Sequence, residues 1–304
     1  MAPPEVLDEL WCEQSVWSQS ANRMKHRIDR ARVAALIIVV VVAITGTAAG
    51  SLSAAFPIGS QVLACVAAAG SALLPLLRPA WSGTKLRNWT RARSASEALK
   101  SDIYLWLAGA GPFVEDSNGA RLRSRVERLR DETADLAVAH TGIEAVKRSL
   151  PSVHDLNSFF ALRVTPQIDD YYVARSIFIR RRIRIFRFVE LGLGFVGAAL
   201  GVLAAAVSSS IASWIAVVAT IGTALAVHVS ATRYEFQLIE FTRTAQRLRQ
   251  IRARATAPGA THEERLRLAA EAEEVISVEN QGWMTKLAEE PPTHDLAKGS
   301  DTSA

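Results

Sequence analysis

VAALIIVVVVAITGTAAGSLS, residues 33–53, contains no charged side chain and decides the fold. As a helix that rises about 1.5 Å per residue, it covers roughly 30 Å, the thickness of the hydrocarbon core of a bilayer. Comparable apolar runs occupy residues 56–77, 189–208 and 211–231. The sequence therefore predicts an integral membrane protein with four transmembrane helices. Because no segment alternates with a period of two, the predicted fold class is all-α.

The four spans pair into two helical hairpins. Only a few residues separate the first two spans, and Ser208-Ser209-Ser210 separates the last two. Helices joined by so short a linker run antiparallel. We therefore expect two transmembrane hairpins whose tips, near Ala54 and Ser209, lie on the same side of the membrane.

Basic side chains flank both hairpins at the ends away from the tips, and the tips carry no charge. They are Arg23, Lys25, Arg27, Arg30 and Arg32; Arg78, Lys85, Arg87, Arg91 and Arg93; Arg175, Arg180, Arg181, Arg182, Arg184 and Arg187; and Arg233, Arg243, Arg247 and Arg249. The positive-inside rule places all these flanks in the cytoplasm. We therefore expect a multi-pass protein of the plasma membrane with its N- and C-termini cytoplasmic.

The arginines before the third span form a predicted membrane-surface group: Arg180, Arg181, Arg182, Arg184 and Arg187. In that place they can meet anionic headgroups. A nucleic-acid-binding protein would instead carry a basic stripe with interleaved aromatics on a soluble domain. The net charge of +5 therefore indicates a lipid bilayer as partner, and no nucleic acid.

The chain divides into two similar units. We predict a first two-span unit over 1–115, a cytoplasmic helical connector over 116–159, a second unit over 160–290 and a disordered tail over 291–304. Asn88-Trp89-Thr90-Arg91 after the first hairpin resembles Glu240-Phe241-Thr242-Arg243 after the second, which suggests a duplication.

Long cytoplasmic helices are expected outside the membrane. We predict that residues 81–108 extend the second span as one long helix, that 160–187 lead into the third span, and that 232–255 lead out of the fourth. A last helix is predicted over 263–287. Pro75 and Pro79 should bend or end the second span, either as a simple kink or as a hinge for gating.

A helix is also predicted over residues 120–150. Leu122, Leu129, Leu136, Ile143 and Leu150 recur every seven residues. The second stripe of the heptad is poor, because Arg125 and Glu132 occupy it. This helix either packs on the other cytoplasmic helices or forms a coiled coil with a second copy.

Small residues mark helix-packing surfaces within the spans. Gly46 and Gly50 form one GxxxG pair, and Gly197 and Gly201 form another. Small residues let helix backbones approach closely in lipid. These glycines pack either within one four-helix bundle or between subunits of a homo-oligomer. The GxGxxG that begins at Gly192 lies within a span and is therefore no nucleotide fingerprint.

Glu190 and His228 are the ionisable residues within or beside the spans. If the third and fourth spans pair about the turn at 208–210, the two residues lie within a turn of each other near the inner interface. Charges at membrane depth raise a functional hypothesis. The two form either an interfacial polar pair without a role, or a pore-lining, proton-sensitive pair.

No motif of catalysis or cofactor binding stands out. Cys12 and Cys65 have no neighbour at metal or redox spacing. The chain shows no Walker loop, no HExxH and no arrangement of nucleophile and base. We therefore expect a protein that is not an enzyme and has no catalytic residues, no cofactor and no metal site.

Scattered aromatic and charged residues resemble a known family. They are Arg87-Asn88-Trp89, Arg93, Glu97-Ala98-Leu99 and Trp106 after the first hairpin; Leu162-Arg163-Val164, Gln167 and Tyr171-Tyr172-Val173-Ala174 before the second; and Glu279-Asn280 with Trp283 near the end. This pattern resembles the SLATT superfamily, the SMODS- and SLOG-associating two-transmembrane effectors of bacteria, with which DUF4231-like membrane proteins are grouped. The resemblance covers 80–115 and 160–288. Arg249 stands where Glu97 would recur, so the two copies are not equivalent.

The resemblance implies a role in nucleotide-activated, anti-phage conflict systems of bacteria. In such systems a partner protein makes or senses the nucleotide, and the two-helix protein then disrupts the inner membrane. We therefore expect a non-enzymatic, pore-forming effector that oligomerises in the inner membrane. The alternative is a membrane-anchored helical scaffold that recruits cytoplasmic partners.

Overall fold

A computed structural model of the chain describes residues 4–207 and 211–288. The predicted turn at 208–210 and the predicted tail at 291–304 lie outside these residues. The elements in chain order are α1 (Pro4–Leu52), α2 (Pro57–Leu77), η1 (Arg78–Trp81), α3 (Gly83–Leu107), η2 (Gly111–Phe113), α4 (Ala120–Glu132), η3 (Ala134–His140), α5 (Leu156–Phe159), η4 (Phe160–Val164), η5 (Gln167–Val173), α6 (Ala174–Ala206), α7 (Ala212–Thr232), α8 (Tyr234–Ala255) and α9 (His262–Ala288). The described part of the chain is helical with connecting loops, which confirms the predicted all-α class.

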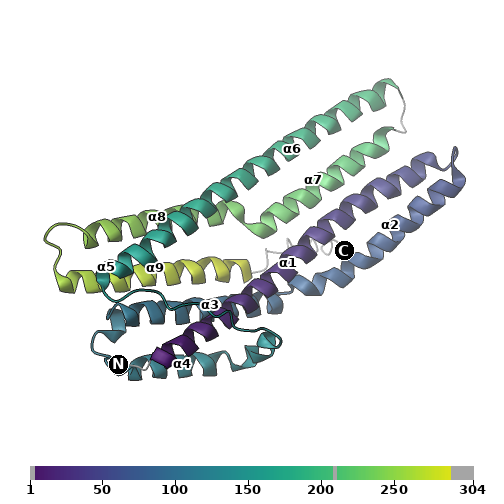
Figure 1. The fold of residues 1–304 in the computed structure, drawn as a ribbon. Helices are drawn as coiled ribbons and strands as arrows, with labels where there is room; N and C mark the ends of the chain where they lie inside the picture. Colours follow the sequence, from purple (N-terminus) through teal and green to yellow (C-terminus); the bar gives the residue numbers. More distant parts are fainter. Residues whose placement is uncertain (1–3, 208–210, 289–304) are drawn as a thin grey trace, which may run out of the picture.

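Four helices are long and apolar enough to cross a membrane, as predicted. Their apolar parts are residues 33–52 of α1, α2, residues 189–206 of α6, and α7, and we name these together the helix row. They lie side by side in the order α6, α7, α1, α2 (Figure 1), because α1 packs against both α2 and α7, and α7 packs against α6. The row is an open layer in which α2 and α6 form the two edges.

The polar parts of the chain form a second, closed region, which we name the polar domain. It is built from the first half of α1 together with α3, α4, α8, α9 and the segment that leads into α6 (Figure 1). Helix α9 lies between α3 and α8 and packs against both. Its contact residues Leu268, Ala269 and Ala272 are at most 1% exposed. Because α3 follows the first hairpin and α8 follows the second, α9 joins the two units.

The first half of α1 is a helix that sequence analysis missed. Helix α1 begins at Pro4 and continues into the first span as one helix of 49 residues. Its polar half buries Leu7, Leu10, Trp11 and Trp17 against the rest of the polar domain. Leu7, Leu10 and Trp11 recur at the spacing of an amphipathic helix, a signal that could have predicted it.

An extended strap follows η3 and crosses the first half of α1. We name residues 141–151 the strap. The Trp11 indole N–H donates to the carbonyl oxygen of Ser149 at 3.1 Å, and the backbone N–H of Val146 donates to the Ser15 hydroxyl at 3.0 Å. The guanidinium of Arg148 lies 4.6 Å from the centre of the Trp11 ring. Side chains of α1 therefore supply the hydrogen bonds that a helix or sheet would supply elsewhere.

The strap shows that the predicted helix over 120–150 is wrong beyond Glu132. Helix α4 ends there, a 3-10 turn follows, and Gly142 takes a positive φ of 71° that ends helical structure. Leu122 and Leu136 are buried in the polar domain, and Leu150 packs against its edge. The heptad leucines therefore contact one core from different elements, and they do not form the seam of a coiled coil.

Two breaks separate the spans from the helices that follow them. Helix α2 ends at Leu77, and the 3-10 turn η1, which contains Pro79, precedes α3. The prediction of one uninterrupted helix is therefore wrong at this turn, and the prediction that proline ends the span is confirmed at Pro79. After the second hairpin, Arg233 takes a left-handed conformation with φ 49° between α7 and α8.

The lead-in to α6 is helical, as predicted, but contains two π-helical segments. Helix α5, η4, η5 and α6 follow one another over 156–206, and η4 and η5 have π-helical hydrogen bonding. Each extra residue in a π turn rotates the following helix relative to an ideal α-helix, and such turns are frequent at functional sites. The segments carry Arg163, Tyr171 and Tyr172, which the family resemblance had singled out.

Candidate functional site

The four predicted packing glycines divide into two packed and two open positions. A Cβ added at Gly46 would lie 3.7 Å from Ala67 of α2, and one at Gly197 would lie 3.6 Å from Val218 of α7. A Cβ at Gly50 or Gly201 would meet nothing within 4 Å. Gly46 and Gly197 therefore pack within each hairpin, and Gly50 and Gly201 face open space.

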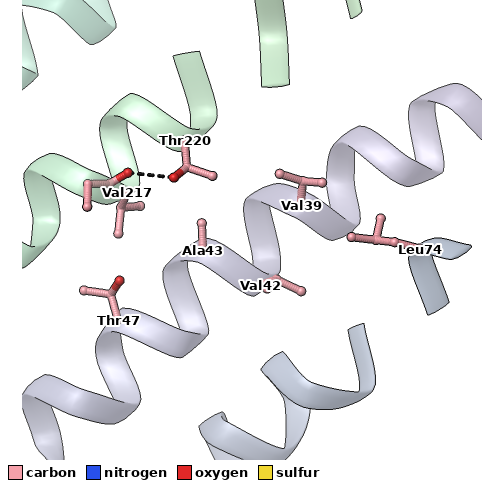
Figure 2. A pocket seen from close by; sticks show the side chains of 8 residues that line it. Val39, Val42, Ala43, Thr47, Leu74, Val217 and Thr220 are labelled. Carbon is pink, nitrogen blue, oxygen red and sulfur yellow. Dashed lines mark hydrogen bonds between the residues drawn. The ribbon is translucent and has the colours of Figure 1, made fainter. Parts of the chain in front are cut away.

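The seam between the two hairpins is loosely packed. A recess of about 200 Å³ lies between α1, α2 and α7. Figure 2 shows its lining, in which Ala43 and Thr47 of α1 face Val217 of α7, and the Thr220 hydroxyl donates to a backbone oxygen of its own helix. The lining is nearly all apolar, so this recess offers no charged group to an ion.

A groove runs along the edge helix α6. It has a volume of about 620 Å³ and is lined by residues of α6: Arg187, Glu190, Leu191, Gly194, Phe195 and Ala198. Gly201 lies on the same side, because it follows Gly194 by seven residues, close to two helical turns. No residue in the most apolar stretch of this helix is buried. The groove is therefore an open surface of the edge helix α6, in which Gly194 and Ala198 leave room between larger side chains such as Leu191 and Phe195.

Glu190 and His228 lie on helices that pack together, but they face different surroundings. The His228 ring lies 6.1 Å from the ring of Phe186, which is one helical turn before Glu190. The Glu190 side chain is exposed and lines the α6 groove beside Arg187. Among the described residues, no hydrogen bond or ion pair joins Glu190 to His228. The predicted pairing of the two residues and a functional role for them stay hypotheses.

The five predicted membrane-surface arginines are exposed on the first half of α6. They do not share one face. Arg180, Arg184 and Arg187 recur at helical spacing on one side, whereas Arg182 shares its side with Arg175, seven residues earlier. Arg187 forms an ion pair of 2.7 Å with Glu235 of α8. The group therefore divides between two sides of the helix.

A buried charge network occupies the centre of the polar domain. The Arg163 guanidinium donates two hydrogen bonds to the Glu273 carboxylate, from Nε at 2.7 Å and from Nη2 at 3.0 Å. Both side chains are 2% exposed. Arg163 also lies 4.9 Å from the centre of the Tyr104 ring, and Arg93 pairs with the largely buried Glu97 at 2.6 Å. We name Arg93, Glu97, Lys100, Arg163 and Glu273 the buried charge network.

The pKa values of Glu97, Lys100 and Arg163 in the buried charge network differ from their ordinary values. Burial alone would lower the pKa of Arg163, but Glu273, together with Glu97 and Tyr104, raises it. Burial opposes ionisation of Glu97, yet Arg93, Lys100 and Arg163 together lower its pKa. Burial lowers the pKa of Lys100 to about 8, and the charge of Arg163 adds to this effect. Arg163 and Glu97 therefore remain charged at neutral pH, and Lys100 stands near its titration point.

The network joins three elements that belong to both units. Glu97 and Lys100 come from α3, Arg163 comes from η4 and Glu273 comes from α9. Arg163 and Glu97 were named in the sequence resemblance. Glu273 was missed, because a glutamate in a helix rich in glutamates gives no signal of burial. Breaking a buried pair leaves one charge without compensation, so this network fixes the position of the π-helical lead-in.

The described residues show no arrangement for metal binding. No group of three His, Cys, Asp or Glu side chains comes together within 4–207 and 211–288. Cys12 and Cys65 are free and lie in different helices of the chain. Continuous helices connect the charged part of the polar domain to the membrane spans.

Comparison with known families gives one match for each of the two hairpins. Residues 159–283 match SLATT_1, the SMODS and SLOG-associating 2TM effector domain 1. Residues 15–120 match DUF4231, a family of proteins of unknown function. No curated protein and no solved structure matches the chain. The residues that carried the sequence resemblance, and Arg249, all fall within these two matches.

Proposed function

We propose that this chain, which belongs to the SLATT superfamily, is a bacterial conflict effector that permeabilises the inner membrane by self-association. The family description supplies the coarse role of a two-transmembrane effector domain. Pore formation, a homo-oligomeric state and a non-enzymatic mechanism are our inferences. The observation that carries them is the open helix row with its small-residue groove on α6.

An open row cannot enclose a path for water by itself. A transmembrane pore needs a closed ring of helices, whereas this row has two edges at α2 and α6. Gly194, Ala198 and Gly201 on the α6 edge let another helix approach closely, which is how helices associate in lipid. Copies that join edge to edge would close such a ring or extend a sheet of helices.

The polar domain can pass a signal to the row through continuous helices. Helix α1 runs from the polar domain into the first span, and the segment over 156–206 runs into the third span. The Arg163–Glu273 pair ties that segment to α9. A partner that displaced α9 would release the lead-in to α6. This fits a trigger delivered by a nucleotide-sensing or nucleotide-synthesising partner protein.

Charge supports an orientation with the polar domain in the cytoplasm. The basic residues of α1 and α6 lie directly before the first and third spans, and the sequence carries no charge at the predicted hairpin tips. Positive residues are retained on the cytoplasmic side during insertion. We therefore place both termini in the cytoplasm and the arginines against anionic headgroups.

Dye entry into cells that overproduce the chain tests this function. In the Gly194→Leu/Gly201→Leu variant each added Cβ meets no atom of its own chain within 4 Å, so the variant should fold, fill the α6 groove and fail to permeabilise. Gly192→Leu is the matched control, because Gly192 is also open but lies on nearly the opposite side of α6. Permeabilisation should be retained in that control.

Two outcomes would contradict the proposal. Equal permeabilisation by the groove variant and by the control would show that the groove has no part in the lesion. An intact membrane with the natural chain, even together with its genomic neighbours, would favour the membrane-anchored scaffold.

A further inference from the structure

Basic side chains from both units converge where the polar domain meets the helix row. They are Lys25 and Arg32 of α1, Arg93 of α3, and Arg175 and Arg182 of α6. We name these five residues the junction cation cluster. The neighbouring His228 of α7 lies within electrostatic range of both Arg32 and Arg182. The cluster therefore spans the boundary between the two units.

In the first unit, helical spacing and helix packing bring the basic residues of the cluster together. Lys25, Asp29 and Arg32 are spaced by four and three residues, which places them on one face of α1. The Lys25 ammonium lies 5.5 Å from the centre of the Trp89 ring on α3. Arg93 follows Trp89 by one turn, so its guanidinium joins the same face. Packing of α1 against α3 thus brings Lys25 and Arg93 together.

On the side of the second unit, an aromatic ring orders two arginines. Arg175 and Arg182 lie 5.5 Å and 5.0 Å from the ring centre of Phe178. Their spacing of seven residues puts them on the same side of α6. Arg175 acts electrostatically on Lys25, and Arg182 acts on His228, so this side of α6 faces α1 and α7.

The cluster holds more positive charge than its acidic neighbours neutralise. Asp29 is the acid that acts on both Lys25 and His228, and Glu97 is already paired with Arg93 at 2.6 Å. Among the described residues, Arg32, Arg175 and Arg182 take part in none of the ion pairs. Burial lowers the pKa of Lys25, and Arg175, Arg93 and Arg32 lower it further against the effect of Asp29. Arg32, Arg175 and Arg182 are therefore available to bind an anion between the facing helices.

We propose that the junction cation cluster binds a phosphate-bearing anion, which holds the two units together at the membrane surface. Guanidinium groups bind phosphate oxygens in a bidentate manner, and an ammonium binds them as a point charge. Arg32 directly precedes the first span, so this end of the cluster lies near the lipid headgroups, whereas Arg175 lies about 20 Å along α6 from the third span, on the cytoplasmic side. The phosphate belongs either to an anionic lipid or to a soluble cytoplasmic compound. This inference does not depend on pore formation.

Binding by the purified full-length chain tests the site and separates the two sources. Native mass spectrometry with phosphatidylglycerol, and with phosphatidylcholine for comparison, counts lipids that stay bound. Thermal unfolding with inorganic phosphate or pyrophosphate reports a soluble ligand. Lys25→Gln/Arg32→Gln removes two cluster charges and should weaken binding by about 30-fold.

The matched control is Arg27→Gln/Arg30→Gln. It removes the same charge from exposed positions on the other side of α1 and should weaken binding by less than about threefold. Asp29→Asn removes an acid from the cluster and should strengthen binding severalfold, which keeps the test valid if the double variant fails to fold.

Each outcome decides the proposal. One phosphatidylglycerol retained per chain, lost in the cluster variant and kept in the control, supports a lipid source. A rise in unfolding temperature with inorganic phosphate or pyrophosphate, absent in the cluster variant, supports a soluble source. Failure of both ligands to bind the natural chain, equal losses in both double variants, or unchanged binding in Asp29→Asn would overturn it.

Discussion

The polar domain and the helix row differ in how far a single chain buries their large side chains. In the polar domain, large side chains such as Tyr172, Phe159 and Leu99 are fully buried, and the buried Arg163 and Glu273 pair with each other. In the row, Phe195 and Leu76 are more than 70% exposed. One region resembles the interior of a soluble protein, and the other offers its surface to lipid or to other copies.

Because of this difference, stability comes mainly from the polar domain, whereas the contacts that can change lie in the helix row. Folding of the polar domain is favoured by burial of apolar surface from water. That force is absent between helices in lipid, where close packing and polar contacts decide association. The chain can therefore keep its polar domain folded while the contacts of the helix row change. A membrane effector that switches between states needs such a division.

The largest expected effect lies in the buried charge network. Arg163→Met leaves the Glu273 carboxylate buried without its partner and should lower the free energy of unfolding by about 3–5 kcal/mol. Arg187→Met breaks a pair of the same length, 2.7 Å, whose side chains are 68% exposed, and should cost at most about 1 kcal/mol. Denaturant unfolding in detergent, followed by circular dichroism, measures both. Equal losses would mean that burial does not determine how much each pair contributes to stability.

Leucine truncations compare apolar packing in the two regions. Leu99→Ala opens a cavity in the core of the polar domain and should lower the free energy of unfolding by about 3 kcal/mol. Leu76→Ala removes a side chain that is 72% exposed on α2, and its effect should stay within about 0.5 kcal/mol. The same unfolding measurement applies. A large loss at Leu76 would instead show that a second copy covers this edge of the row.

Titration of Lys100 gives a smaller, pH-dependent effect. Its folded-state pKa of about 8 lies below the ordinary 10.5, so between these values the unfolded chain binds the extra proton. Stability should therefore rise with pH across this window, by about 1–2 kcal/mol. Lys100→Met should be more stable than the natural chain at pH 7, and the difference should vanish by pH 10.5. A difference that does not vary with pH would contradict the assignment.

The smallest expected effect concerns the strap, the part of the polar domain without helical structure. Arg148→Ala removes a hydrogen bond of 2.6 Å to the buried Gln14 and the contact with Trp11. The strap should open more readily by about 1 kcal/mol. Hydrogen exchange of the amide groups of 141–151 measures this opening, and Lys147→Ala, on an exposed position, serves as control. Unchanged exchange in Arg148→Ala would show that the strap is held by its backbone contacts alone.

Sequence alone predicted the spans because charge and hydropathy are local properties. The four apolar runs and their flanking arginines follow from which residues tolerate lipid. The helix over 263–287 was also predicted, and α9 spans it. The start of α1 at Pro4 was missed, although Leu7, Leu10 and Trp11 recur at the spacing of an amphipathic helix.

Features that depend on tertiary contacts could not be predicted from the sequence. The burial of Glu273 requires Arg163 from a segment 110 residues away. Gly50 and Gly201 look equivalent to Gly46 and Gly197 in sequence, and only the order of helices in the row separates open positions from packed ones. A helix was predicted over the strap because leucines recur every seven residues. Leucines from several different elements that contact one core can show the same spacing.

The central claim is that copies of this chain complete the open helix row through the groove of α6. Subunit counting by single-molecule photobleaching of labelled chains in liposomes tests it most directly. We expect more than one bleaching step per assembly for the natural chain and for Gly192→Leu, and one step for Gly194→Leu/Gly201→Leu. Single steps for the natural chain, or unchanged assemblies in the groove variant, would contradict the account.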